Sequence, residues 1–158
     1  MSVEIERKFL VDHALWNALA KPDPNYLIQG YLHSEPGKTI RVRATNNKGF
    51  ITIKGKSSAD GLSRSEFEYE IPKQDALNLL SAFTQKTIEK NRYEITFKGN
   101  VWEVDVFEGS NAGLIVAEIE LESTEQSFTK PDWVREEVTS DFRYFNSALI
   151  EKPYENWK

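Results

Sequence analysis

The chain has 158 residues, of which 39% are apolar and 28% charged, and its formal net charge is −5. These values predict one globular domain over residues 1–158 and argue against a general nucleic-acid binder, because such proteins are normally basic. With no cysteine and two histidines, the chain excludes disulfides, thiolate metal sites, cysteine nucleophiles and a multi-histidine metal site. No apolar run reaches the roughly 20 residues of a membrane span and no signal peptide precedes Glu4, so we expect a cytoplasmic protein without membrane contact.

Alternating polar and apolar residues dominate the chain and predict eight strands. Short turn-forming segments rich in Gly, Pro and Asn separate several of them, which favours antiparallel hairpins. The predicted strands cover residues 2–10, 27–34, 38–45, 49–56, 64–71, 88–98, 101–108 and 114–122.

Three helices are predicted between and after these strands. Asp12 can cap a first helix that ends before Pro22, and Pro72 precedes a second with an apolar stripe. A third is expected from residue 140 or 141 through 149. Together the elements predict a mainly β (α+β) domain, and an eight-stranded antiparallel closed barrel with about three flanking helices is favoured over a sandwich.

Charged residues of like sign recur two positions apart in most predicted strands, beginning with Glu4, Glu6 and Lys8. Side chains two apart share a strand face, where like charges repel each other. A solvated outer face is the alternative interpretation, but mixed signs would suit such a face better. We therefore expect the charged faces to point into the barrel. The later groups are Arg41 and Arg43; Lys54 and Lys56; Glu66, Glu68 and Glu70; Lys90 and Arg92; Glu103 and Asp105; Glu118, Glu120 and Glu122.

An eight-stranded barrel is wide enough to hold a small ligand, and its charges indicate which kind. Arginine and lysine side chains bind the oxygens of an oligophosphate. Carboxylates without histidine or cysteine suit hard divalent ions, Mg²⁺ or Mn²⁺. A phosphate chain held together with metal ions predicts phosphoryl-transfer chemistry.

With these motifs assembled, the chain resembles the CYTH superfamily, also called triphosphate tunnel metalloenzymes, over essentially its whole length. The motifs in order are Glu4-Ile5-Glu6-Arg7-Lys8, Arg41-Val42-Arg43, Lys54-Gly55-Lys56, Glu66-x-Glu68-x-Glu70, Lys90-x-Arg92-Tyr93, Trp102-Glu103-Val104-Asp105, Glu118-x-Glu120, Glu137-Val138-Thr139, Arg143-Tyr144 and Asn146.

The resemblance implies a tunnel that binds a triphosphate with divalent metal. It implies metal ligation by Glu4, Glu6, Glu118 and Glu120, and catalytic roles for Lys8, Tyr31, Glu4 and Glu6. It implies triphosphate binding by Lys8, Arg41, Arg43, Lys54, Lys90, Arg92 and Arg143, with Glu66, Glu68 and Asp105 as supporting acidic residues. Strand alternation also allows His33 on the same face as Tyr31.

The predicted activity is metal-dependent hydrolysis of inorganic tripolyphosphate to pyrophosphate and phosphate. One alternative is nucleotide chemistry, either an adenylate cyclase or a nucleoside or thiamine triphosphatase, although no insertion suggests a pocket for an organic group. The other is a non-catalytic module that binds polyphosphate, which would not need so many carboxylates. The predicted partner is a small-molecule triphosphate, and the apolar outer strand faces are compatible with a homodimer.

Overall fold

A computed structural model describes residues 2–157 and shows nine strands. They are β1 (Ser2–Val11), β2 (Asn25–Glu35), β3 (Lys38–Ala44), β4 (Gly49–Gly55), β5 (Ser63–Ile71), β6 (Ile88–Phe97), β7 (Asn100–Phe107), β8 (Ile115–Glu120) and β9 (Val134–Glu137). The helices are α1 (His13–Ala18), α2 (Lys73–Phe83) and α3 (Asn146–Glu151), with 3₁₀ turns η1 (Gly109–Asn111), η2 (Phe142–Tyr144) and η3 (Tyr154–Asn156). Within residues 2–157 none of the helices is long and apolar enough to cross a membrane.

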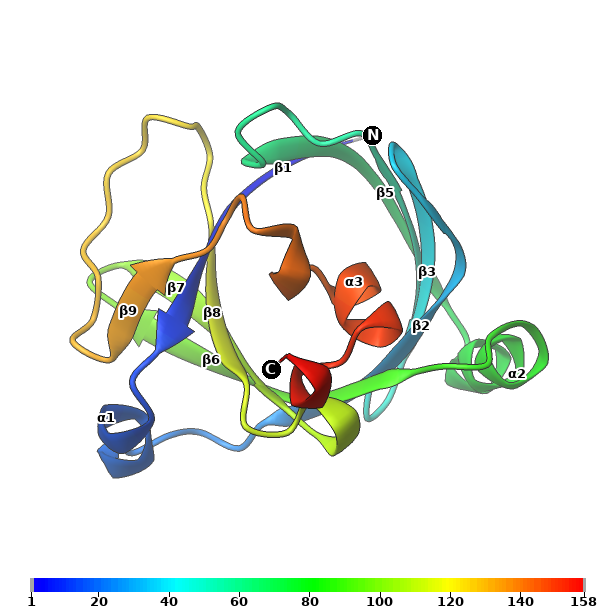
Figure 1. Cartoon of the computed structure of the whole chain (residues 1–158), viewed down its shortest axis with the longest axis horizontal. Helices are drawn as coiled ribbons and strands as arrows, with labels where there is room; N and C mark the ends of the chain where they lie inside the picture. Colours follow the sequence, from blue (N-terminus) through cyan, green and yellow to red (C-terminus); the bar gives the residue numbers. More distant parts are fainter. Residues whose placement is uncertain (1, 158) are drawn as a thin grey trace.

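Strand β1 closes the sheet into a barrel (Figure 1). The strand order is β5-β4-β3-β2-β6-β7-β8-β1, and β1 also pairs with β5. Its first residues, Ser2–Ile5, pair antiparallel with β5, whereas residues 6–10 pair antiparallel with β8. The predicted closed barrel is confirmed, with every strand boundary within two residues of expectation. Strand β9 was not predicted: it is four residues long and extends the sheet by pairing with the end of β1.

Two apolar layers cover the outside of the barrel. Helix α2 packs Ala76 and Leu80 against the outer faces of β2, β3 and β4. A Cβ at Gly49 would lie 2.7 Å from the Cβ of Ala76, so glycine is what permits this close approach. On the other side, Trp16 of α1 and Trp133 pack with Trp102 on the outer face of β7.

The C-terminal segment fills one end of the barrel instead of flanking it. In Figure 1 the strands surround α3, while α1 and α2 lie outside the ring. Leu149 of α3 is fully buried against Ile88, Phe107 and Val116. Each of these strand residues lies two positions from a charged interior residue, so it shares that residue's face. The inner face is therefore charged along most of its length and apolar at the end that α3 closes.

The third predicted helix begins later than expected. Residues 142–144 form the 3₁₀ turn η2, and Asp141 caps it by accepting a hydrogen bond from the Arg143 N–H. Phe145 has extended backbone angles (φ −68°, ψ 139°), and α3 follows it. This break places the Phe145 ring on the wall of the cavity described next.

Candidate active site

A polar cavity of about 310 Å³ lies inside the barrel, lined mainly by charged and hydroxyl side chains from the eight barrel strands. The loop around residues 57–62 and the segment before α3 complete its wall. Alternation along each strand brings these residues to one face, and closure of the barrel brings the faces together. The predicted site residues that line it are Glu4, Glu6, Lys8, Tyr31, Arg41, Arg43, Lys54, Glu66, Glu68, Arg92, Glu118 and Glu120.

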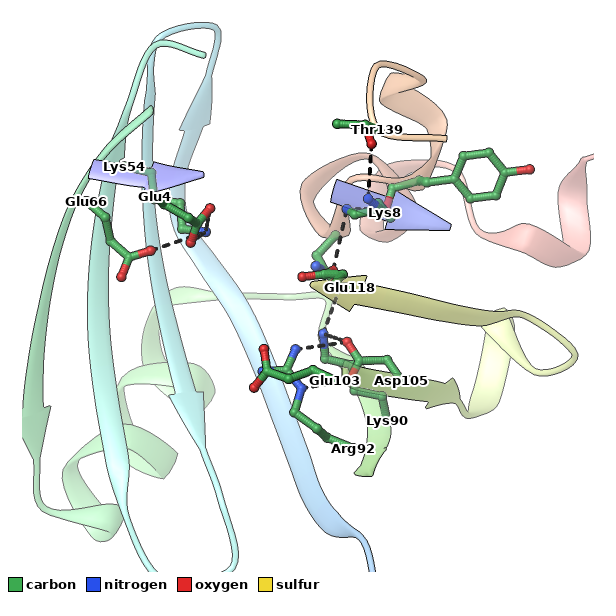
Figure 2. Close-up of polar contacts among 12 residues, drawn as sticks. Glu4, Lys8, Lys54, Glu66, Lys90, Arg92, Glu103, Asp105, Glu118 and Thr139 are labelled. Atoms are coloured by element: carbon green, nitrogen blue, oxygen red, sulfur yellow. Dashed lines mark hydrogen bonds and ion pairs between the residues drawn. The ribbon is translucent and has the colours of Figure 1, made fainter. Parts of the chain in front are cut away.

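Three predicted site residues lie elsewhere. Lys90 and Asp105 are almost completely buried beneath the cavity, where Lys90 Nζ lies 2.7 Å from the Asp105 carboxylate (Figure 2). Lys90 also donates to Asn146 Oδ1, at 3.2 Å, which ties α3 to the barrel. Arg143 is exposed and pairs with Asp141 at 2.7 Å, because the 3₁₀ turn holds both residues on the surface. Lys90 and Arg143 thus do not line the cavity.

Carboxylates gather where β1 meets β5 and β8. They form the acidic wall of the cavity, which consists of Glu4, Glu6, Glu66, Glu68, Glu118 and Glu120. Burial, with the charges of Glu118 and Glu4, raises the pKa of Glu6 to about 8. Burial and contact with Glu66 also raise the pKa of Glu4, and burial together with Glu4 raises that of Glu120. Burial is the largest cause of each shift, and the neighbouring carboxylates add to it. A cation in their midst would relieve the repulsion.

Lys8 bridges the acidic wall and the C-terminal segment (Figure 2). Its Nζ lies 3.7 Å from Glu118, whose strand pairs with β1 in a register that sets the two residues opposite each other. Burial would raise the pKa of Glu118, but Lys8, with Arg92 and Lys90, lowers it to about 2. Lys8 Nζ also donates to the Tyr144 carbonyl oxygen at 3.3 Å. Glu118 is therefore ionised at neutral pH.

Arginines form the basic wall, and neutral groups hold two of them. Arg41 donates to Thr52 Oγ1 at 3.1 Å, and Arg43 donates to Gln29 Oε1 at 2.8 Å. Burial and then the charges of Arg41 and Arg92 lower the pKa of Arg43 to about 9. Such mutual repulsion among cations marks a place where an anion would be stabilised.

Arg92 completes this wall and is oriented by Asp105 through two hydrogen bonds of 2.8 and 2.9 Å (Figure 2). Burial works against ionisation of Asp105, yet Arg92 and Lys90 hold its pKa well below the usual range. Asp105 thus positions Arg92 from beneath the cavity.

Sequence reasoning missed several lining residues, and Arg64 is the most important of them. Arg64 lies at the start of β5, opposite Glu4 on β1. The Phe145 ring contacts two cations: its centroid lies 5.1 Å from Lys8 Nζ and 5.7 Å from Arg64 Cζ. Arg64 could have been found because it stands two residues before Glu66 and so shares its strand face. Glu103, which alternation predicted to point into the barrel, also lines the cavity. The other lining residues outside the predicted set are Thr39, Thr52, Ser57, Gly61, Leu62, Ser63, Thr139, Phe145, Asn146 and Ser147.

The acidic wall fits a hard divalent cation by its chemistry. Within residues 2–157 no three His, Cys, Asp or Glu side chains already stand in a metal-binding arrangement. The raised pKa values of Glu4, Glu6 and Glu120 nevertheless mark carboxylates that lack sufficient positive charge. Their donors are all oxygens, which Mg²⁺ and Mn²⁺ prefer. Glu118 faces the same cavity.

The fold and the site together define a closed antiparallel β-barrel that encloses one acidic and one basic wall. The CYTH domain model matches residues 2–154, so the chain belongs to the CYTH domain family.

Named relatives resemble the chain over nine-tenths of its length or more. An inorganic triphosphatase of Acetivibrio thermocellus is 47% identical over 159 residues, covering 100% of this chain and 99% of that protein. An inorganic triphosphatase of Nitrosomonas europaea is 38% identical over 154 residues, covering 92% of this chain and 95% of that protein. A crystal structure of an inorganic triphosphatase aligns with a TM-score of 0.63 at 34% identity, covering 95% of each chain.

Proposed function

We propose that this protein hydrolyses inorganic tripolyphosphate to pyrophosphate and phosphate with the help of Mg²⁺ or Mn²⁺. The observation that carries the proposal is the cavity, in which an acidic wall faces a basic wall inside a closed barrel. The two full-length relatives named inorganic triphosphatase support it. A cytoplasmic location and a homodimer stay predictions from the sequence.

The basic wall would bind the phosphate chain. Four basic side chains line the cavity, so they can contact a ligand inside it without any movement of the backbone. They are Lys8, Arg41, Arg43 and Arg92. Planar guanidinium groups can donate two hydrogen bonds to the oxygens of one phosphate. Arg64, which also lines the cavity, is proposed as a further phosphate ligand.

The acidic wall would hold the metal through Glu4, Glu6, Glu118 and Glu120, with Glu66 and Glu68 supporting it. A bound divalent ion would neutralise phosphate charge and orient a water molecule for attack. In-line attack on a terminal phosphorus breaks its bond to the bridging oxygen, so the leaving pyrophosphate gains negative charge. Arginines already fixed by Thr52, Gln29 and Asp105 would stabilise that charge without rearranging.

Tyr31 is proposed as a hydrogen-bond donor in the same site. It lines the cavity and pairs with Arg41 across β2 and β3. At the end of the barrel that α3 closes, Leu149 and its apolar neighbours fill the space beyond the charged face. Because an organic group attached to the phosphate chain would have no room there, this end favours a bare triphosphate.

Phosphate release from tripolyphosphate, ATP and pyrophosphate, with and without Mg²⁺ or Mn²⁺, tests the proposal. We expect metal-dependent release from tripolyphosphate far above that from the other two. Cyclic AMP formation from ATP would instead indicate a cyclase, and tight tripolyphosphate binding without turnover would indicate a binding module.

Replacing one carboxylate of the proposed metal site tests its role. Glu6→Gln should lower metal-dependent turnover by roughly 100-fold or more, as expected when electrostatic stabilisation of a transition state is lost. Glu70→Gln is the matched control, because Glu70 pairs with Lys48 at the exposed surface. Circular dichroism would verify that both variants fold, and turnover of Glu6→Gln at the unmodified rate would refute the assignment.

A further inference from the structure

Lys54 lies against two carboxylates of the acidic wall, those of Glu4 and Glu66 (Figure 2). Its Nζ lies 2.9 and 2.8 Å from the two carboxylate oxygens of Glu4 and 3.6 Å from Glu66 Oε2. The three side chains are shielded from solvent, with 12%, 13% and 18% of their surface exposed for Lys54, Glu4 and Glu66. The ammonium therefore supplies part of the positive charge that these two carboxylates need.

Barrel closure creates this arrangement. Lys54 and Glu66 stand opposite each other on β4 and β5, whereas Glu4 belongs to β1 on the far side of β5. Both oxygens of Glu4 face the same ammonium. A divalent cation bound to Glu4 would need those oxygens, and two cations cannot share them without strong repulsion.

We propose that Lys54 is an internal competitor of the divalent cation and that an incoming oligophosphate removes it from Glu4. Lys54 lines the cavity, so its flexible stem can carry the ammonium from the carboxylates to phosphate oxygens. Glu4 then becomes available to the metal. The identity of the anion rests on the proposed function, but the competition between Lys54 and the metal does not.

Competition makes the binding of metal and of oligophosphate cooperative. Anion binding frees Glu4 for the metal, and by thermodynamic linkage metal binding frees Lys54 for the anion to the same extent. If Lys54 occupies Glu4 about nine-tenths of the time, the apparent metal affinity of the free protein is about tenfold weaker than the intrinsic affinity.

Isothermal titration with Mg²⁺ or Mn²⁺ alone, and with tripolyphosphate alone, provides the first test. Lys54→Met should bind the metal about tenfold more tightly than the unmodified protein and should bind metal-free tripolyphosphate more weakly. Lys48→Met is the matched control, since it removes a lysine from an exposed pair with Glu70 and should change neither affinity. Unchanged or weaker metal binding by Lys54→Met, including undetectable binding, would overturn the proposal.

Amine labelling of the unmodified protein followed by mass spectrometry separates displacement of Lys54 from a general effect of charge. Saturating metal should increase labelling of Lys54 severalfold, and subsequent tripolyphosphate should protect it again. Lys86, whose side chain is 59% exposed, should label throughout, whereas fully buried Lys90 should not. Equal labelling of Lys54 with and without the metal would overturn the proposal, even if tripolyphosphate turnover is observed. Conversely, metal-dependent labelling without turnover would refute the proposed function alone.

Discussion

The role of a charged residue in this barrel depends on its depth as well as its type. Lys90 and Arg92 share one face of β6, yet Lys90 is completely buried while Arg92 reaches the cavity. Asp105 binds both. Because an unpaired buried charge is costly, this group of three acts as a support that orients Arg92 and leaves Lys90 no access to a ligand.

The sequence predicts phosphate binding by Arg143 and not by Arg64, whereas the structure places Arg64 on the cavity wall and Arg143 at the surface. Variants of the two residues therefore distinguish the two predictions. Arg64→Gln should raise the KM for tripolyphosphate by roughly 10-fold or more, because a charge-assisted hydrogen bond to phosphate contributes about 1.5–3 kcal/mol. Arg143→Gln should leave the KM within about twofold, since its exposed ion pair with Asp141 contributes little. Steady-state phosphate release measures both, and the reverse order of effects would contradict this placement.

At the scale of single elements, local irregularities decide which side chains reach the cavity. A register shift between Tyr31 and His33 in β2 pairs Tyr31 with Arg41 but His33 with Ile40. Simple alternation would keep both on one face, and the bulge removes His33 from the lining. In the C-terminal segment, the extended backbone of Phe145 between η2 and α3 instead brings the Phe145 side chain onto the cavity wall.

Helix α3 should contribute substantially to the stability of the barrel despite its six residues. Leu149→Ala should lower the free energy of unfolding by about 2–5 kcal/mol, because Leu149 is fully buried and its loss leaves a cavity. Phe142→Ala removes a larger side chain from the same segment, but that side chain is exposed and its loss should cost less than about 0.5 kcal/mol. Denaturant unfolding would compare the two, and equal losses would argue against α3 as a structural plug.

At the scale of the whole molecule, the barrel holds charges that oppose its own folding. Glu4, Glu6 and Glu120 all have raised pKa values, whereas Asp105 and Glu118 have lowered ones. The two groups affect stability in different pH ranges. The lowered pKa values contribute stability that is lost as the pH falls below about 4, where the carboxylates gain protons.

The raised pKa of Glu6 predicts that the metal-free protein becomes less stable as the pH rises. Between its usual pKa of 4.5 and about 8, the folded state holds a proton that the unfolded state has lost. The free energy of unfolding in chelator should therefore fall between pH 5 and 8, by about 1–3 kcal/mol. Glu6→Gln should flatten this slope, and added Mg²⁺ should stabilise the unmodified protein more at pH 8 than at pH 5. A stability that rises over this interval would contradict the prediction.

Strand alternation in the sequence was enough to predict the fold class and most of the residues that line the cavity. Because side chains two apart share a face, like-charged pairs from Glu4 to Glu120 predicted a closed barrel with a charged interior, and its fold and most of its lining residues follow. The depth of each residue, and the contacts made across the closure of the barrel, were decided only by the tertiary structure. Periodicity tells which face a residue occupies, but not how far along the barrel it lies or what fills the end. The tertiary structure was therefore needed to show three features: the burial of Lys90, the surface position of Arg143, and the Lys54–Glu4 pair across the β1–β5 closure.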